Sequence, residues 1–195
     1  MANKLIGADY LLALLYCDNK SSIKGSVRLT KMMYLFDKEI KPIIEKKGGK
    51  CEKLPEFIPY NFGPFSKDLY EQIELFKGIE FITTKEILSK EIMVEEVDDW
   101  EENPYIGESL NDEEHLTFNK KYIEYTIAKR GESYYENVIK NELNQDILDL
   151  LEQFKKKIVK ISVKNLLYYV YTKYPEMTVN SIIKKDVLGS DEDEN

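Results

Sequence analysis

The fold is decided by residues 57–70, FIPYNFGPFSKDLY. Two prolines and a glycine in its first part exclude a helix there, so the pattern predicts extended chain before Ser66. Ser66 is a good N-cap for a helix that begins directly after it, and Pro64 also suits a first helical turn. Apolar residues then recur at helical spacing until Gly78 ends the helix, at Leu69, Tyr70, Ile73, Leu75 and Phe76.

Two helices are predicted before this stretch. The first covers residues 8–18, where Leu11, Leu12, Leu15 and Tyr16 are spaced for one helical face. The second runs from about residue 27 to residue 40, and Pro42 limits it or kinks its end. The residues that it is expected to turn toward solvent are Arg28, Lys31 and Lys38.

After the central stretch, alternating residues predict strands at 79–84 and 122–127, and more weakly at 92–94. Further helices are predicted at 132–141, 146–158 and 163–173, with one short helix within 177–188. Three helices, two strands and a helix follow the winged-helix order, in which the third helix and the strand hairpin (the wing) usually contact nucleic acid. The expected fold class is α+β, mainly helical: a winged helix-turn-helix with a C-terminal helical extension.

The expected organisation is a winged-helix domain at 1–141, a helical extension at 142–188 and a disordered acidic tail at 189–195. Charge supports this division, because the formal charge of −8 is concentrated in two places. An acidic insert within the wing, at about 91–116, holds eleven carboxylates and no Lys or Arg, and the tail holds four more carboxylates. The remaining residues are mildly basic, with 21 acids against 28 Lys and Arg.

Charge on the third helix disfavours conventional DNA binding. Its expected exposed residues sum to −1, whereas a helix in the major groove needs Lys and Arg to neutralise phosphates. These residues are Lys67, Asp68, Glu71, Gln72, Glu74 and Lys77. A protein partner is favoured instead, and its candidate contacts are Asn61, Ser66, Lys67, Glu71 and, in the insert, Trp100 and Tyr105.

Nucleic acid binding by another face stays an alternative. Five lysines within ten residues predict a basic strip, which is either a solvated helix face or a phosphate-binding surface. The candidate nucleic-acid contacts are Arg28, Lys31, Lys155, Lys156, Lys157, Lys160 and Lys164. The acidic insert likewise has three interpretations: a solubilising loop, an arm that covers a basic partner surface, or a segment that masks the chain's own lysines.

Catalysis, metal binding and cofactor binding are not predicted. His115 is the one histidine, and the chain has no phosphate-binding glycine loop, dinucleotide fingerprint or nucleophile-elbow motif. Cys17 and Cys51 form no CxxC pair, and Cys17 is expected to be a small buried apolar residue. With no apolar run long enough to cross a bilayer and no signal-peptide pattern, a cytoplasmic protein is expected.

Three ordered stretches resemble one family. They are RLTKMMYL at Arg28–Leu35, YNFGPFSKDLY at Tyr60–Tyr70 and YTIAKRGE at Tyr125–Glu132. They are similar to the RLQKLxYL, YxYGPxSxxLY and YxLTxxG blocks of Panacea (SocA-like antitoxin) domains and their YwgA-like relatives. VYTKYPEMT at Val170–Thr178 resembles a further VYxKYPEYT element of the same relatives.

The resemblance covers roughly residues 10–180 and implies a non-catalytic module. In relatives, such a module is an antitoxin, a toxin-neutralising adaptor or a transcription factor near phage-defence genes. The implied partner is a toxin or defence effector, and a homodimer built on the C-terminal extension stays open. The acidic insert departs from the family pattern, which argues against DNA contact by the wing.

Overall fold

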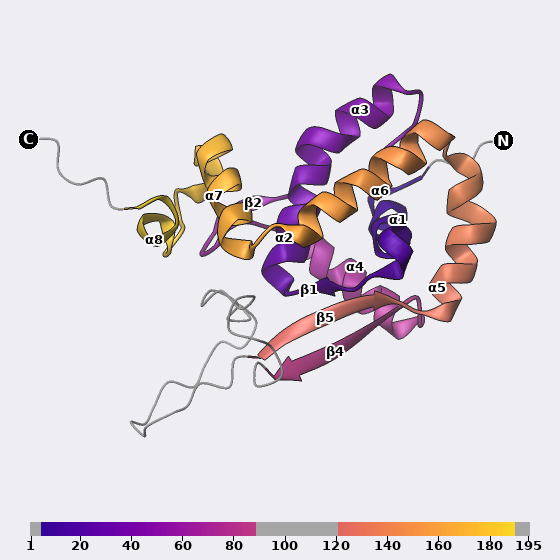
Figure 1. Cartoon of the computed structure of the whole chain (residues 1–195), viewed down its shortest axis with the longest axis horizontal. Coiled ribbons are helices and arrows are strands. Elements are labelled where there is room, and N and C mark those ends of the chain that lie inside the picture. The colour runs from indigo at the N-terminus through magenta and orange to yellow at the C-terminus, as the bar shows by residue number, and fades with distance from the viewer. Residues whose placement is uncertain (1–4, 89–120, 190–195) are drawn as a thin grey trace, which may run out of the picture.

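The computed structural model describes residues 5–88 and 121–189 (Figure 1). Helices form most of these residues and the strands form two small antiparallel sheets, so the predicted class, α+β and mainly helical, is confirmed. Within the described ranges, no helix has both the length and the apolar character that crossing a membrane requires.

Helix α1 (Gly7–Lys20) lies at the centre of the core. Residues 10–15 are at most 1% exposed, because α6 (Gln145–Lys160), β5 (Lys121–Ile127) and the helical segment η3 (Tyr135–Ile139) all pack against it (Figure 1). The predicted helix at 8–18 is confirmed. The last three residues of the element, Asp18 to Lys20, have φ between 52° and 61°, so the chain leaves α1 through a left-handed turn.

The second helix is longer than predicted. α2 (Ser26–Leu35) continues through a π-helical turn, η1 (Phe36–Ile40), into α3 (Lys41–Lys46). The predicted end near Ile40 is therefore wrong. Pro42 lies in α3 directly after the π-helical turn, so the proline falls inside a continuous helical segment and does not end it.

The central stretch forms a hairpin followed by a helix. β2 (Ile58–Tyr60) pairs antiparallel with β3 (Gly63–Phe65), and α4 (Lys67–Gly78) begins directly after Ser66. The Ser66 hydroxyl accepts a hydrogen bond from the Leu69 N–H at 3.2 Å. The predicted extended chain, the Ser66 cap and the end at Gly78 are all confirmed.

Gly63 is the residue on which the hairpin turn depends. Its φ is +82°, and a Cβ there would lie 2.8 Å from Cε1 of Tyr171 in α7 (Val163–Lys173). Gly48 has a similar φ of +84° but open space around it. We expect Gly63→Ala to lower the free energy of unfolding by about 2–3 kcal/mol and Gly48→Ala by about 1 kcal/mol. Urea denaturation of both variants checks this, and equal losses would show that Tyr171 can move aside.

The main sheet has the strand order β1–β5–β4, with β1 at Ile23–Lys24 and β4 at Ile82–Leu88. In the antiparallel register, Tyr125 of β5 pairs with Ile23 on one side and Thr84 on the other. The strand predicted at 122–127 is confirmed. β4 begins three residues later than predicted, because residues 79–81 form a turn in which the Phe81 N–H donates to the Phe76 carbonyl at 2.8 Å. The strand predicted at 92–94 and the acidic insert at 91–116 lie outside the described residues.

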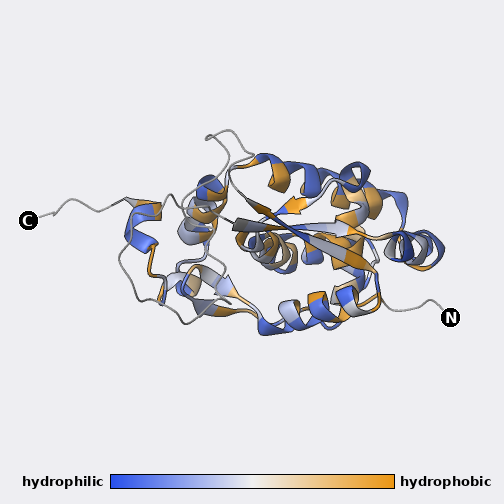
Figure 2. Cartoon of the chain, turned by 90° about the horizontal axis from the view of Figure 1, so that it is seen from below, coloured by the Kyte–Doolittle hydropathy of each residue, from blue (hydrophilic) through white to orange (hydrophobic). Residues whose placement is uncertain are grey.

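The C-terminal helices complete the core. α5 (Lys129–Tyr134) leads through η3 and η4 (Lys140–Glu142) to α6, which packs against α1, and α7 packs against α2. η5 (Pro175–Thr178) and α8 (Lys184–Leu188) end the described chain. The helices predicted at 146–158 and 163–173 are confirmed. Buried side chains of residues 142–188 join one hydrophobic cluster with those of α1 and α2, and apolar helix faces turn inward in Figure 2.

Candidate protein-binding site

A groove of about 500 Å³ lies between α4 and the strands β4 and β5. From α4 it is lined by Tyr70, Glu71, Ile73, Glu74 and Lys77, and from the strands by Thr84, Ile123 and Tyr125. Ile73 and Tyr125 are buried, whereas Glu71 and Glu74 are exposed. The groove therefore has an apolar floor with carboxylates at its edge on α4.

The two lysines of α4 form ion pairs with glutamates of the same helix. Lys67 pairs with Glu71 at 3.1 Å, and Lys77 pairs with Glu74 at 2.8 Å. Asp68 accepts a hydrogen bond from the backbone N–H of Glu56 at 3.1 Å. Two lysines and three acids leave this helix with the net negative charge that the sequence predicted.

The predicted partner contacts that the structure describes differ in their exposure. Lys67 and Glu71 are exposed on α4, as predicted. Ser66 is fully buried as the cap of α4, so the prediction that it reaches a partner is wrong. Asn61 is half-buried, and its carbonyl accepts the Ile182 N–H at 3.0 Å. Trp100 and Tyr105 lie outside the described residues.

The two predicted nucleic-acid contacts on α2, Arg28 and Lys31, form hydrogen bonds to backbone carbonyls of other elements. Lys31, expected to face solvent, is 2% exposed and its Nζ donates to the Pro64 carbonyl at 2.8 Å, so that prediction is wrong. Burial lowers the pKa of Lys31 to about 7. Arg28 is half-buried and donates to the carbonyls of Ile158, at 2.9 Å, and Ile161, at the C-terminal end of α6.

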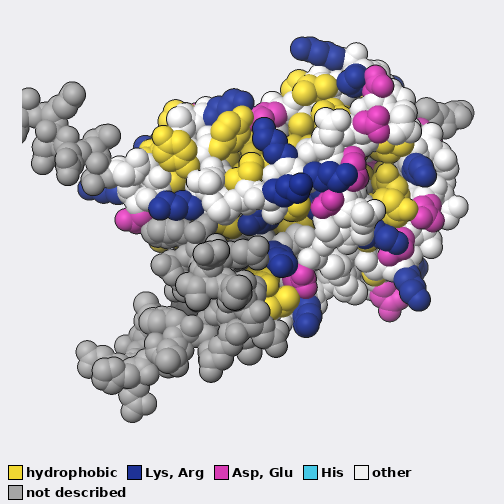
Figure 3. Space-filling model, viewed as in Figure 1, with side chains coloured by type: hydrophobic (Ala, Val, Ile, Leu, Met, Phe, Trp, Pro, Cys, Tyr) yellow, Lys and Arg dark blue, Asp and Glu magenta, His cyan; other side chains and the backbone are white. Residues whose placement is uncertain are grey.

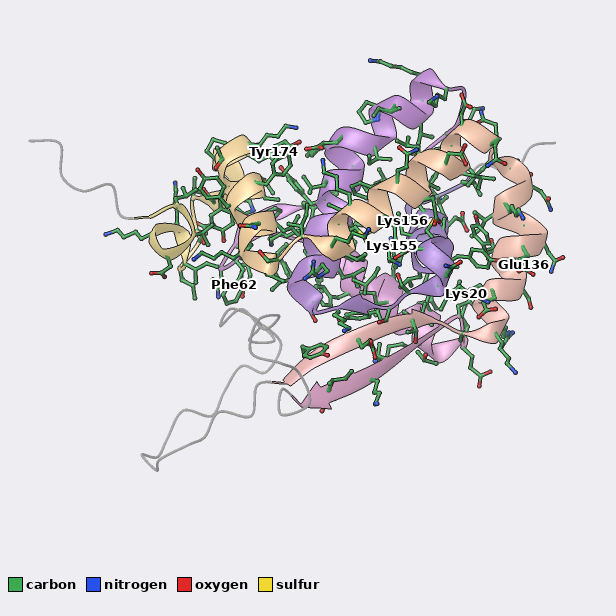
Figure 4. All side chains as sticks on the ribbon, viewed as in Figure 1. Lys20, Phe62, Glu136, Lys155, Lys156 and Tyr174 are labelled. Atoms are coloured by element: carbon green, nitrogen blue, oxygen red, sulfur yellow. The ribbon has the colours of Figure 1, made fainter. Side chains whose placement is uncertain are left out.

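Lys155 is not part of a basic strip. It is fully buried, and its Nζ donates to the carbonyls of Leu14 and Ser21, each at 2.9 Å, where α1 ends. Burial lowers its pKa to about 8. The adjacent Lys156 is exposed and pairs with Glu152 at 2.9 Å (Figure 4). Lys157, Lys160 and Lys164 are also exposed, so four of the five predicted lysines remain on the surface.

Helical spacing in the sequence is compatible with an internal position for both Lys155 and Lys31. Lys155 lies four residues after Leu151 and one after Phe154, which places it beside the buried face of α6. Lys31 lies four residues after the buried Val27. A lysine among apolar positions of a helix is thus a candidate for an internal hydrogen bond as well as for a surface cation.

Groups that could support catalysis are few in the described part of the chain. Cys17 and Cys51 are both buried, which confirms the expectation for Cys17, and burial raises the pKa of each thiol, to about 12 for Cys17. Within residues 5–88 and 121–189, no three His, Cys, Asp or Glu side chains gather as a metal site would require. His115 lies outside these ranges.

No family model matches this chain, and a search of curated proteins gave no match. The likeness to Panacea domains therefore rests on the four sequence blocks. Two of these blocks meet in space, because Lys31 of the first block donates to the Pro64 carbonyl of the second.

Proposed function

We propose that this chain is a non-catalytic winged-helix module that regulates a protein partner by binding it, in the manner of an antitoxin or a phage-defence adaptor. The cytoplasm is the compartment that fits this role. The partner class follows from the groove described above, and the antitoxin-like role follows from the resemblance to Panacea domains.

The order of elements supports the winged-helix part of the proposal. α1, β1, α2, α4, β4 and β5 occur in the order helix, strand, helix, helix, strand, strand, with η1, α3 and the β2–β3 hairpin inserted between α2 and α4. The order β1–β5–β4 places the two strands of the hairpin side by side with the short strand at one edge. In this frame α4 is the third helix and β4–β5 is the wing.

The observation that carries the proposal is the groove between α4 and the wing. A phosphate backbone needs cations along this surface, yet the edge of the groove bears Glu71 and Glu74, and Lys77 is engaged by Glu74. An apolar floor with an acidic edge is complementary to a protein segment that combines large apolar side chains with Lys or Arg.

DNA binding through the remaining lysines has weaker support. Lys156 is neutralised by Glu152, and Lys155 is internal. In the view of Figure 3, Lys and Arg side chains are interspersed with Asp and Glu over much of the surface. Exposed Lys157, Lys160 and Lys164 keep this alternative open as an outcome of the test below.

Peptide selection tests the proposal without a known partner. We expect a displayed random-peptide library to yield binders that combine Lys or Arg with a large apolar residue. Glu71→Lys should weaken such peptides at least about tenfold, because it places a cation where the peptide cation binds. Isothermal titration of the selected peptides measures the effect.

Glu45→Lys is the matched control, because Glu45 is an exposed acid on α3, away from the groove, and the substitution changes the charge equally. It should leave peptide affinity within about twofold. The proposal fails if Glu71→Lys has no greater effect than Glu45→Lys. It also fails if a duplex DNA binds at nanomolar Kd in about 150 mM salt while no peptide is selected.

A further inference from the structure

Four large apolar side chains are exposed where the β2–β3 hairpin meets the chain between η5 and α8. They are Ile58 and Tyr60 of β2 and Val179 and Ile182 of the connecting segment, and each is between 40% and 68% exposed. Single exposed apolar residues are common on protein surfaces, whereas several together mark a surface that binds something. We call these four residues the apolar patch.

Hydrogen bonds hold the two parts of the apolar patch side by side. The Asn180 side-chain amide donates to the Pro59 carbonyl at 3.1 Å, and the Ile182 N–H donates to the Asn61 carbonyl at 3.0 Å. The two patch residues of β2 are two positions apart, so their side chains point to the same face of the strand. Both segments lie at the end of the molecule that carries α7 and α8 (Figure 1).

The connecting segment is also anchored to the core. The hydroxyls of Tyr171 in α7 and Ser181 lie 2.8 Å apart, and the Ser181 hydroxyl accepts a hydrogen bond from the Ile183 N–H at 3.3 Å. Tyr171 and Ile183 are buried. Because these contacts already fix the segment in the single chain, binding through the patch loses little conformational entropy.

The size of the apolar patch matches the centre of a protein interface. Its exposed fractions correspond to roughly 450 Å² of apolar surface, and the largest patches on single chains, which are often functional, cover about 300–600 Å². A stable interface covers about 800 Å² on each partner, with an apolar centre inside a polar rim. Exposed Glu56, Asn180 and Lys184 follow or precede patch residues closely in the chain and supply such a rim. Patch and rim together therefore approach the area that a stable dimer needs.

A second copy of this chain is the occupant that these properties favour. In a two-fold interface the same surface lies on both sides, so each side chain must tolerate its own kind across the axis. The apolar patch has no charged member, and Ile, Val and Tyr side chains pack together without like-charge repulsion. The groove beside α4 shares no residue with the patch, and its acidic edge would repel a second copy of itself.

We propose that the apolar patch is the contact between two copies of this chain in a two-fold dimer. Val179 and Ile182 lie at the centre of this contact, because they are the two most exposed members of the patch. None of the residues that line the groove belongs to the patch, so the dimer carries two grooves.

Sedimentation velocity of the whole chain over a range of concentrations tests the proposal. We expect a dimer at about 100 µM that dissociates on dilution, because an interface with a small apolar centre gives a modest affinity. Ile182→Asp should raise the dissociation constant at least about tenfold, because it places two carboxylates in an apolar contact.

Leu75→Asp is the matched control. Leu75 is 60% exposed on α4 and lies outside the patch, and the substitution introduces the same charge. Because surface substitutions away from a contact have small effects, the dissociation constant should stay within about twofold.

Cross-linking identifies the surface that forms the dimer. The native thiols of Cys17 and Cys51 are buried, so a thiol introduced on the surface is the accessible one. A short bis-maleimide should join two chains of Val179→Cys and should not join two chains of Leu75→Cys.

The proposal is overturned if the chain stays monomeric up to about 500 µM. It is also overturned if Ile182→Asp weakens association no more than Leu75→Asp. A monomeric chain from which Ile182→Asp removes a selected peptide would assign the patch to a different protein. The proposed function is tested separately, because peptides selected on the groove should bind Ile182→Asp as tightly as the unsubstituted chain.

Discussion

Lys155→Ala is expected to lower the free energy of unfolding by about 3 kcal/mol. The substitution removes the donor to the Leu14 and Ser21 carbonyls and leaves a space inside the core. These two carbonyls flank the left-handed turn at Asp18–Lys20. Carbonyls at the end of a helix have no helical N–H to accept from, so they need another donor. Urea denaturation followed by far-ultraviolet circular dichroism measures the loss.

Lys156→Ala is the control, because Lys156 is the exposed neighbour on the same helix. Its denaturation midpoint should stay close to that of the unsubstituted chain, since the ion pair with Glu152 is on the surface. If the two variants unfold at the same urea concentration, Lys155 does not hold the end of α1. A loss of stability in Lys155→Ala but not in Lys156→Ala would support the assignment of Lys155 as an internal residue that a nucleic acid cannot reach.

Lys31→Met is expected to change the pH dependence of stability. The pKa of Lys31 is lowered by burial to about 7, against a usual value of 10.5. The unfolded chain therefore binds more protons than the folded chain between these two pKa values, and stability rises with pH in this window. From pH 6 to pH 9, the unsubstituted chain should gain about 2–3 kcal/mol relative to Lys31→Met, because methionine has no ammonium to bury.

Urea denaturation of both proteins at pH 6, 7.5 and 9 checks this expectation. The contribution of Lys155, whose pKa is also lowered, is present in both proteins and cancels in the difference. Lys38→Met, at an exposed lysine, should show no such trend. A constant difference between the unsubstituted chain and Lys31→Met over this range would contradict the burial of the Lys31 ammonium.

Much of the secondary structure was accessible from local patterns. Ser66 marks the start of α4 because a cap acts through nearby backbone groups. The helix ends at Gly78 as predicted, but the left-handed residue that follows it is Glu80, with a φ of 61°. The alternation at 122–127 predicted β5 because successive side chains of a strand point to opposite faces, which is also a local pattern. β1 was missed because two residues carry no period, and the strand exists through its pairing with Tyr125 and Glu124.

The candidate site was predictable only in part. The negative charge of α4 follows from its sequence, and Lys67 and Glu71 are exposed as expected. The groove itself needs Thr84, Ile123 and Tyr125 from strands that follow α4 in the chain, so no local pattern reveals it. The hydrogen bond from Lys31 to the Pro64 carbonyl likewise joins α2 to a hairpin some thirty residues later.

The sequence by itself determined the helix caps, the alternating strands, the segregation of acidic residues and the negative sign of α4. These properties depend on neighbouring residues or on composition, which the chain carries in any fold. Only the tertiary structure decided that Lys31 and Lys155 are internal, that Ser66 is buried and that an apolar groove opens beside α4. Burial and cavities arise where distant segments meet, and a lysine has the same formula whether its ammonium faces water or a carbonyl.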